Sequence, residues 1–145
     1  MYVRVEKHTG FRVRGFRTPI RSNRDILQAR QRLFNILEAQ RKYPRITYGV
    51  MYSQTDEALL IDTYFAGIIG DSSILLESAE EVIVSSGRYV IAGGGENENY
   101  DPLEYIKLVR NADYFQFRKA PILETYSRNI ETGEESAELW IPIQD

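Results

Sequence analysis

The sequence predicts an α+β fold in which a β-α-β-β unit occurs twice within one domain. Two observations lead to this prediction. Strand-like and helix-like patterns follow each other in the same order in both halves of the chain, and the only stretch of linker-like composition, residues 70–73, separates the halves. The length of 145 residues fits one domain with a sizeable core. We therefore expect a single domain over residues 1–145, with repeats at about 1–69 and 79–145.

The first unit begins with a strand and a helix. Apolar and charged residues alternate over residues 2–7 and 11–16, which predicts one long strand with a break or bulge at Gly10. Asn23 is a typical N-cap residue, and the apolar stripe after it predicts a helix up to Tyr43-Pro44.

The second unit repeats this order. Residues 80–92 read as a strand that ends at Gly93-Gly94-Gly95. Asp101, Pro102 and Glu104 then have the types expected at the cap, the first and the third position of a helix. We therefore expect the second helix to start here.

Each unit closes with a predicted hairpin. The β-rich runs 46–53 and 58–67 are joined by four polar residues, and the runs 121–128 and 136–143 by a polar loop with one glycine. With these hairpins, each unit has the order β-α-β-β.

Aligning the two hairpins singles out one residue. Tyr52-Ser53 matches Tyr126-Ser127 at a separation of 74, and this alignment makes Val50 the counterpart of Glu124. A carboxylate thus replaces an apolar residue between related strands. Chance similarity of two short hairpins is the alternative explanation.

The charge is unevenly distributed, which bears on nucleic-acid binding. The net charge is -3, but residues 1–45 carry 12 Lys and Arg against 3 Asp and Glu, and residues 46–145 carry 6 against 18. A basic segment can bind nucleic acid. Here many of the basic residues fall on the predicted first helix, without interleaved aromatic residues or a helix-turn-helix pattern. We expect charge pairing within the molecule and no direct nucleic-acid binding.

Several chemistries are excluded by composition. Without cysteine there is no disulfide, thiolate metal site or thiol nucleophile, and His8 as the only histidine argues against zinc, haem and a Ser-His-acid triad unless His8 itself serves. Residues 93–95 lack the Lys-Ser/Thr of a phosphate loop, and residues 97–101 lack the glycine of a calcium loop. We therefore expect no metal and no cofactor.

The chain also lacks membrane and export signals. No run approaches the roughly 18 apolar residues of a membrane span, and the first residues carry charges where a signal peptide is apolar. We expect no membrane association and a cytoplasmic location.

Glu124 is the residue most at odds with its surroundings. It lies in an apolar and aromatic strand, and a half-buried strand does not carry a charge without a partner or a ligand. Strand alternation puts Ile122, Glu124 and Tyr126 on one face. If the first helix covers the opposite face, these residues look across an open sheet surface toward tyrosines of the first unit. Aromatic faces around a carboxylate suit a cationic, partly apolar ligand.

A plainer interpretation stays open. The tyrosines are ordinary strand-forming residues, and Glu124 pairs with an arginine of the basic first third.

Three motifs carry a resemblance to a known family. They are the Glu-x-Tyr of Glu124-Thr125-Tyr126, the closing strand Leu139-Trp140-Ile141-Pro142-Ile143, and Ser86-Gly87-Arg88-Tyr89, which looks like a Gly-x-Tyr entry to the second repeat. With these, nearly the whole chain resembles the GyrI-like, or AraC-type, effector-binding domain family. The resemblance implies duplicated β-α-β-β units with a curved antiparallel sheet and a ligand groove between the repeats.

The same resemblance implies a function. Such domains are the ligand-sensing part of multidrug-responsive regulators, and Glu124 matches the acidic residue that meets cationic drugs at the base of an aromatic pocket. The family also includes gyrase inhibitors and a hydrolase branch in which a groove glutamate activates water. We expect a stand-alone member without a DNA-binding segment. Gly94-Gly95-Glu96 stands where the family often has Gly-Pro-Tyr, so the pocket rim differs.

Our leading hypothesis is a protein that binds a hydrophobic, cationic, drug-like small molecule. The expected ligand-binding residues are Glu124, Tyr126, Tyr48, Val50, Tyr52, Tyr64, Tyr89 and Trp140; Tyr64 is matched with Trp140 in the repeat.

Two alternatives remain. In the first, the chain is a hydrolase with Glu124 as general base and Tyr126 as proton donor. In the second, it is a gyrase-inhibitor-like interaction module whose acidic second half meets a separate protein partner.

Overall fold

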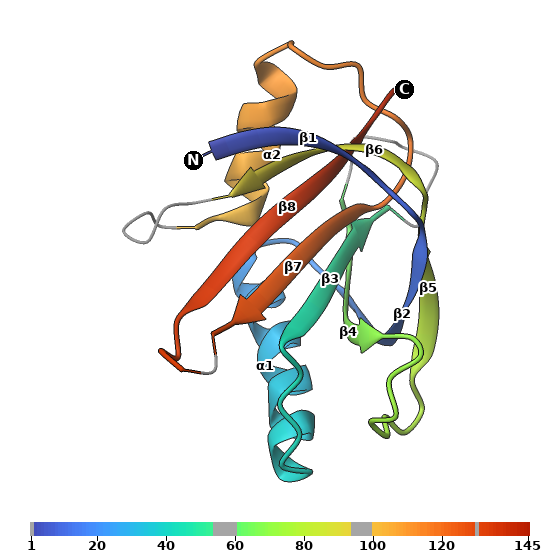
Figure 1. The fold of residues 1–145 in the computed structure, drawn as a ribbon, viewed down its shortest axis with the longest axis vertical. Helices are drawn as coiled ribbons and strands as arrows, with labels where there is room; N and C mark the ends of the chain where they lie inside the picture. The colour runs from blue at the N-terminus through green and yellow to red at the C-terminus, as the bar shows by residue number, and fades with distance from the viewer. Residues whose placement is uncertain (1, 54–60, 94–99, 130) are drawn as a thin grey trace.

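The computed structural model describes residues 2–53, 61–93, 100–129 and 131–145, which form one eight-stranded antiparallel sheet and two helices (Figure 1). The α+β class predicted from the sequence is confirmed, and the elements follow in the predicted order. They are β1 (Tyr2–His8), β2 (Phe11–Pro19), α1 (Asn23–Ala39), β3 (Ile46–Tyr52), β4 (Thr63–Ile69), β5 (Glu80–Val84), β6 (Gly87–Gly93), α2 (Pro102–Asn111), β7 (Ile122–Arg128) and β8 (Glu135–Ile143).

The strand order is β1-β6-β8-β7-β3-β4-β2-β5, so that β7 and β3 meet at the centre of the sheet. Each half of the sheet consists mainly of strands from one β-α-β-β unit. One half contains β6, β8 and β7, and the other contains β3, β4 and β2. The outer strands are exchanged, because β1 pairs with the second unit and β5 with the first.

A long two-stranded ribbon links the two ends of the sheet. Residues 2–15 pair with residues 80–93 in one unbroken register, first as β1 with β6 and then as β2 with β5. The ribbon bends at the predicted break, Gly10, where a Cβ atom would lie 2.7 Å from the Val84 carbonyl oxygen. The partner strand was predicted to be continuous over residues 80–92. It bends at the same place and is divided into β5 and β6, and β6 begins at Gly87, whose φ is 141°. In Figure 1 the ribbon passes over the top of the molecule and down its right side.

Both helices pack on the same face of the sheet. α1 contacts β2 and β4, and α2 contacts β8; in Figure 1 they lie behind the sheet. The larger part of the core lies between this face and the helices. Its members include Ile26, Leu33 and Leu37 of α1, Ile106 and Val109 of α2, and Met51, Ile122, Leu139 and Ile141 of the strands.

A second, smaller core fills the opposite face, which the bent sheet partly encloses. Its buried members are Val13, Val50, Phe65, Val84, Tyr89, Ile91 and Leu123. The sheet therefore buries side chains on both faces. Because side chains alternate along a strand, neighbouring residues of one strand enter different cores.

The helix starts differ from each other in how they are capped. The predicted cap at Asp101 is confirmed, since its Oδ1 accepts a hydrogen bond of 3.0 Å from the backbone N–H of Glu104. At α1 the cap is Ser22 instead of the predicted Asn23, and its side chain makes no capping hydrogen bond.

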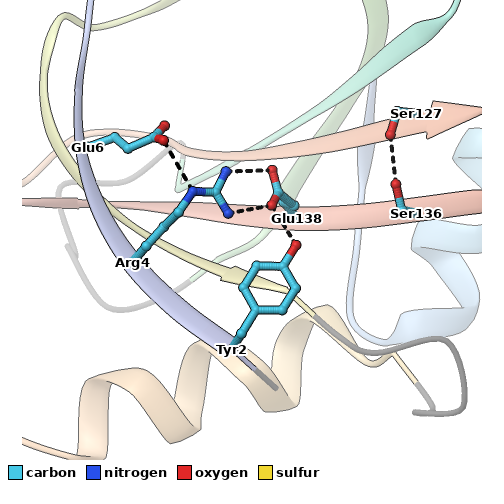
Figure 2. Close-up of polar contacts among 6 residues, drawn as sticks. All are labelled: Tyr2, Arg4, Glu6, Ser127, Ser136 and Glu138. Atoms are coloured by element: carbon cyan, nitrogen blue, oxygen red, sulfur yellow. Dashed lines mark hydrogen bonds and ion pairs between the residues drawn. The ribbon is translucent and has the colours of Figure 1, made fainter.

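The edge strand β1 is fastened to β8 across β6 by polar side chains (Figure 2). The Tyr2 hydroxyl donates to Glu138 at 2.6 Å, and the Arg4 guanidinium donates to both carboxylate oxygens of Glu138 at 2.7 and 3.2 Å. Gly93 lies under the Tyr2 ring and leaves room for it. Because Arg4 hydrogen-bonds to it, the Glu138 carboxyl has a pKa below its usual value.

Some predictions fall on residues outside the described ranges. They are the first hairpin loop at 54–57, the first residues of the strand predicted from 58, and the segment 94–99. The strand itself begins at Thr63. No helix of the described part of the chain is both long and apolar enough to cross a membrane.

Candidate functional site

The Glu124 side chain lies in β7, on the helix-covered face, and is 0% exposed. One carboxylate oxygen, Oε1, accepts a hydrogen bond of 2.6 Å from the Tyr64 hydroxyl, and Oε2 accepts one from the Tyr100 hydroxyl. The Tyr126 hydroxyl also interacts electrostatically with the carboxylate. Its partners are thus tyrosines, and among the described residues no cationic side chain forms an ion pair with it within 4.0 Å.

A glycine lets Tyr64 reach Glu124 across an intervening strand. Tyr64 belongs to β4, and β3 lies between β4 and β7. Gly49 of β3 is directly opposite Glu124, and a Cβ atom there would overlap the Tyr64 hydroxyl. Only a residue without a side chain leaves space for the Tyr64 ring, so we assign Gly49 to the site. A glycine inside a predicted strand signals such a close approach.

Tyr100 reaches the carboxylate from the start of α2. It directly precedes Asp101, the N-cap, and its ring packs edge to face on Tyr105 at 5.3 Å and on Tyr126 at 6.1 Å between centroids. It is partly exposed, whereas Tyr64 is fully buried. Tyr100 was not among the site residues predicted from the sequence.

Arg30 of α1 places a positive charge at the outer side of the site. Its guanidinium lies over the Tyr126 ring and attracts the Glu124 carboxylate without forming an ion pair. A guanidinium over a tyrosine face is a cation–π contact. The sequence left open that Glu124 pairs with an arginine of the basic first third. Arg30 is such an arginine, but it attracts the carboxylate from a distance and forms no ion pair with it.

Burial dominates the electrostatics of the site. It raises the pKa of Glu124 above the ordinary value, and the tyrosine hydrogen bonds and the Arg30 charge offset this only in part. Burial, followed by the nearby Glu124 charge, also raises the pKa of Tyr64, Tyr100 and Tyr126. The three hydroxyls therefore keep their protons, and those of Tyr64 and Tyr100 donate to the carboxylate.

The structure brings together only three of the predicted site residues: Glu124, Tyr64 and Tyr126. The others lie on the opposite face of the sheet, in or against the second core; they are Tyr48, Val50, Tyr52, Tyr89 and Trp140. The prediction that Tyr48, Val50 and Tyr52, with Trp140, share the surface of Glu124 was wrong.

The error comes from register and from the assumed position of the helices. Across β3 and β7, Glu124 is paired with Gly49, and Val50 with Leu123. Paired residues point to the same face, so Val50 points away from Glu124 and is not its counterpart. Tyr64 and Trp140 likewise belong to different cores and are not counterparts. The helices cover the Glu124 face, not the opposite face as expected.

Three of these five residues, Tyr48, Tyr89 and Trp140, take part in an aromatic cluster with His8 and Phe11. The Trp140 ring contacts His8 at 5.0 Å and Tyr89 at 6.0 Å, and Phe11 contacts Tyr48 at 5.2 Å between centroids. The Trp140 Nε1 atom is buried and has no hydrogen-bond partner among the residues that the structure describes. Because Trp140 lies across the sheet from Glu124, its fluorescence does not directly report on the Glu124 site.

The described residues contain no group of three or more His, Cys, Asp or Glu side chains that could hold a metal ion. The site consists of one carboxylate, three protonated tyrosine hydroxyls, of which two donate hydrogen bonds to it, and one guanidinium over a tyrosine ring.

Solved structures share this fold along the whole chain. The structure of SAV2435 bound to tetraphenylphosphonium is 15% identical, with a TM-score of 0.65, and covers 99% of this chain and 94% of that chain. The Vibrio cholerae integron cassette protein VCH_CASS2 is 18% identical, with a TM-score of 0.64 and coverages of 98% and 95%. The EcmrR C-terminal domain is 14% identical, with a TM-score of 0.61 and coverages of 99% and 98%. No family model and no curated protein matches the sequence.

At these identities the similarity concerns the fold. The chain has the GyrI-like fold, an antiparallel sheet with two helices, as expected from the resemblance.

Proposed function

We propose that this protein binds a hydrophobic organic cation at Glu124. The observation that carries the proposal is a carboxylate with 0% exposure whose hydrogen-bonding partners are neutral tyrosines. A buried charge without an ionic partner lowers the stability of the fold, and such groups are concentrated at functional sites. A cationic ligand would supply the missing charge.

The surroundings favour an organic cation over a metal ion or an ammonium group. The site is rich in aromatic rings, and a ring face attracts a diffuse positive charge by about 0.5–2 kcal/mol. In the unliganded protein the Arg30 guanidinium occupies one face of Tyr126. A phosphonium or quaternary ammonium also needs no hydrogen-bond acceptors of its own. Its transfer into an aromatic site therefore leaves no polar group unsatisfied.

Access to the carboxylate would require one tyrosine to move, because Tyr64 and Tyr100 occupy both oxygens. Tyr100 is the better candidate, since it is partly exposed and lies at the end of a helix, whereas Tyr64 is enclosed between strands and helices. We infer that the ligand displaces Tyr100. The fold neighbour SAV2435, bound to tetraphenylphosphonium, supports a ligand of this class.

The test is isothermal titration with tetraphenylphosphonium of the wild type, Glu124→Gln and Glu138→Gln. Loss of one partner of a buried charge pair costs ~2 kcal/mol or more, so Glu124→Gln should bind roughly 30-fold more weakly. Glu138→Gln removes the same charge from the other face and should keep the wild-type affinity. Equal binding by all three proteins would refute the role of Glu124.

The affinity should also depend on pH in a set direction. Burial raises the pKa of Glu124, and only the ionised form attracts a cation. Affinity should therefore fall as the pH is lowered through that pKa, and Glu124→Gln should lack this dependence.

The finer expectations from the sequence stay predictions: ligand sensing for a multidrug-responsive or AraC-type system, a cytoplasmic location and a separate protein partner. The hydrolase alternative would need space for a water molecule at Glu124, where tyrosines now occupy both oxygens.

A further inference from the structure

The sequence predicted that the basic residues of the first third form ion pairs within the molecule, and in the described part of the chain only some of them do. The ion pairs found among the described residues involve Arg4, Arg12 and Arg17 of the strands. No basic residue of α1 or of the segment 40–45 that follows it forms one. A group of cationic side chains is therefore left without acidic partners near the end of this helix.

Several of these side chains surround one pocket, here called the outer pocket. It has a volume of about 470 Å³, including space open to solvent, and lies between α1, the segment 40–45, and the ends of β3 and β7. Its cationic members are Arg30, Lys42, Arg45 and Arg128, and its only acidic member is Glu135. The lining thus carries a formal charge of +3, in a protein whose net charge is -3.

The walls of the outer pocket are apolar. Phe34 is 40% exposed and Tyr43 is 59% exposed, and both face this space together with Leu37 and Pro44. Exposed aromatic side chains beside cations without an acidic partner form a surface that combines apolar contact area with positive charge. They match a ligand that has an apolar body and a negative group.

The outer pocket is separate from the carboxylate of Glu124 but shares a wall with it. Arg30 and Tyr126 both line the pocket, and both interact electrostatically with Glu124. The four cationic side chains of the outer pocket would repel a cation and attract an anion.

From this arrangement we propose that the outer pocket binds an aromatic organic anion. Its negative charge would lie near Lys42, Arg45 and Arg128, and its rings against Phe34 and Tyr43. Arginine side chains attract anions electrostatically and also stack on aromatic rings, so an aromatic anion meets both kinds of contact. This site goes beyond the cation site at Glu124 and does not depend on it.

Two probes of the same shape and opposite charge test the proposal. Tetraphenylborate and tetraphenylphosphonium are each titrated by calorimetry, in sodium buffer of low ionic strength because exposed charges are screened by salt. The variant K42Q/R45Q/R128Q removes three cations from the pocket. Each exposed charge contributes about a factor of two, so this variant should bind tetraphenylborate about eightfold more weakly.

A matched control removes the same charge elsewhere. The variant R21Q/R24Q/R88Q replaces three exposed arginines that do not line the pocket, and it should keep tetraphenylborate binding within about twofold of the wild type, as expected for charges screened at a distance. Circular dichroism verifies that both variants are folded.

The Glu124→Gln variant separates this proposal from the proposed cation site. It should leave tetraphenylborate binding unchanged while it weakens tetraphenylphosphonium binding. Absence of tetraphenylborate binding to the wild type, or equal weakening by the two triple variants, would overturn the anion site whatever happens at Glu124. So would a loss of tetraphenylborate binding in Glu124→Gln.

Discussion

Replacing Glu124 by glutamine should stabilise the unliganded protein. The glutamine has the same shape, and its amide oxygen can still accept hydrogen bonds from Tyr64 or Tyr100. What disappears is the cost of holding a negative charge at a position with 0% exposure. The substitution that should weaken cation binding should thus strengthen the fold.

The sign follows from the direction in which the pKa of Glu124 moves. Burial raises that pKa in the folded protein, which means that the fold favours the protonated carboxyl. The stabilising contribution of this proton is fully present below the pKa of the unfolded chain and is lost as the pH rises through the folded-state pKa. Glutamine does not titrate. The advantage of Glu124→Gln over the wild type should therefore be small at pH 4 and grow toward pH 8.

The magnitude is limited by two opposing effects. Desolvation of a buried carboxylate costs several kcal/mol, and hydrogen bonds from tyrosines return much of it. A net gain of about 1–2 kcal/mol at pH 8 remains, which for a domain of this size raises Tm by about 3–6 °C.

The assay is urea denaturation and thermal unfolding of both proteins between pH 4 and pH 8. Glu138→Gln is the matched control, because Arg4 lowers the pKa of Glu138 and its contribution is present above the unfolded pKa and lost as the pH falls. That variant should be less stable than the wild type at pH 8, by a few tenths to about 1 kcal/mol. A Glu124→Gln protein that loses stability as the pH rises, relative to wild type, would refute the reasoning.

Three further predictions concern the support of the site. Gly49→Ala should push the Tyr64 hydroxyl away from Glu124 and reduce the free energy of unfolding in urea by ~1–3 kcal/mol, the cost of a buried group left without its partner. Asp101→Ala should lower the unfolding free energy by about 0.5–2 kcal/mol through loss of the helix cap, and Asp101→Asn should restore most of it. Arg30→Met should tighten tetraphenylphosphonium binding by roughly fivefold in calorimetry, because a resident cation worth up to ~1 kcal/mol no longer opposes the ligand.

Local patterns were enough to predict the order of the elements. Period-two alternation identified the strands, and the residue types at Asp101 and Pro102 located the start of α2. The break at Gly10 was also visible, because a glycine between two alternating runs marks a bend. These features depend on neighbours a few residues away, which the sequence displays directly.

The members of the site could be predicted only in part. Glu124 stood out as a charge in an apolar strand, and Tyr126 follows it by one period of the strand. Tyr100 did not stand out, since it is 24 residues from Glu124 and precedes a helix in a polar segment. Gly49 carried a signal, a glycine inside a strand, whose meaning depends on which side chain crosses it.

The sequence by itself determined the fold class, the succession of strands and helices, and the anomaly at Glu124. Only the tertiary structure decided which face of the sheet the helices cover and which residues join Glu124. The physical reason is the alternation of side chains along a strand: a register change of one residue moves a side chain to the other face. Pairing of Gly49 with Glu124 therefore separates Val50 and Tyr48 from the site and opens the way for Tyr64.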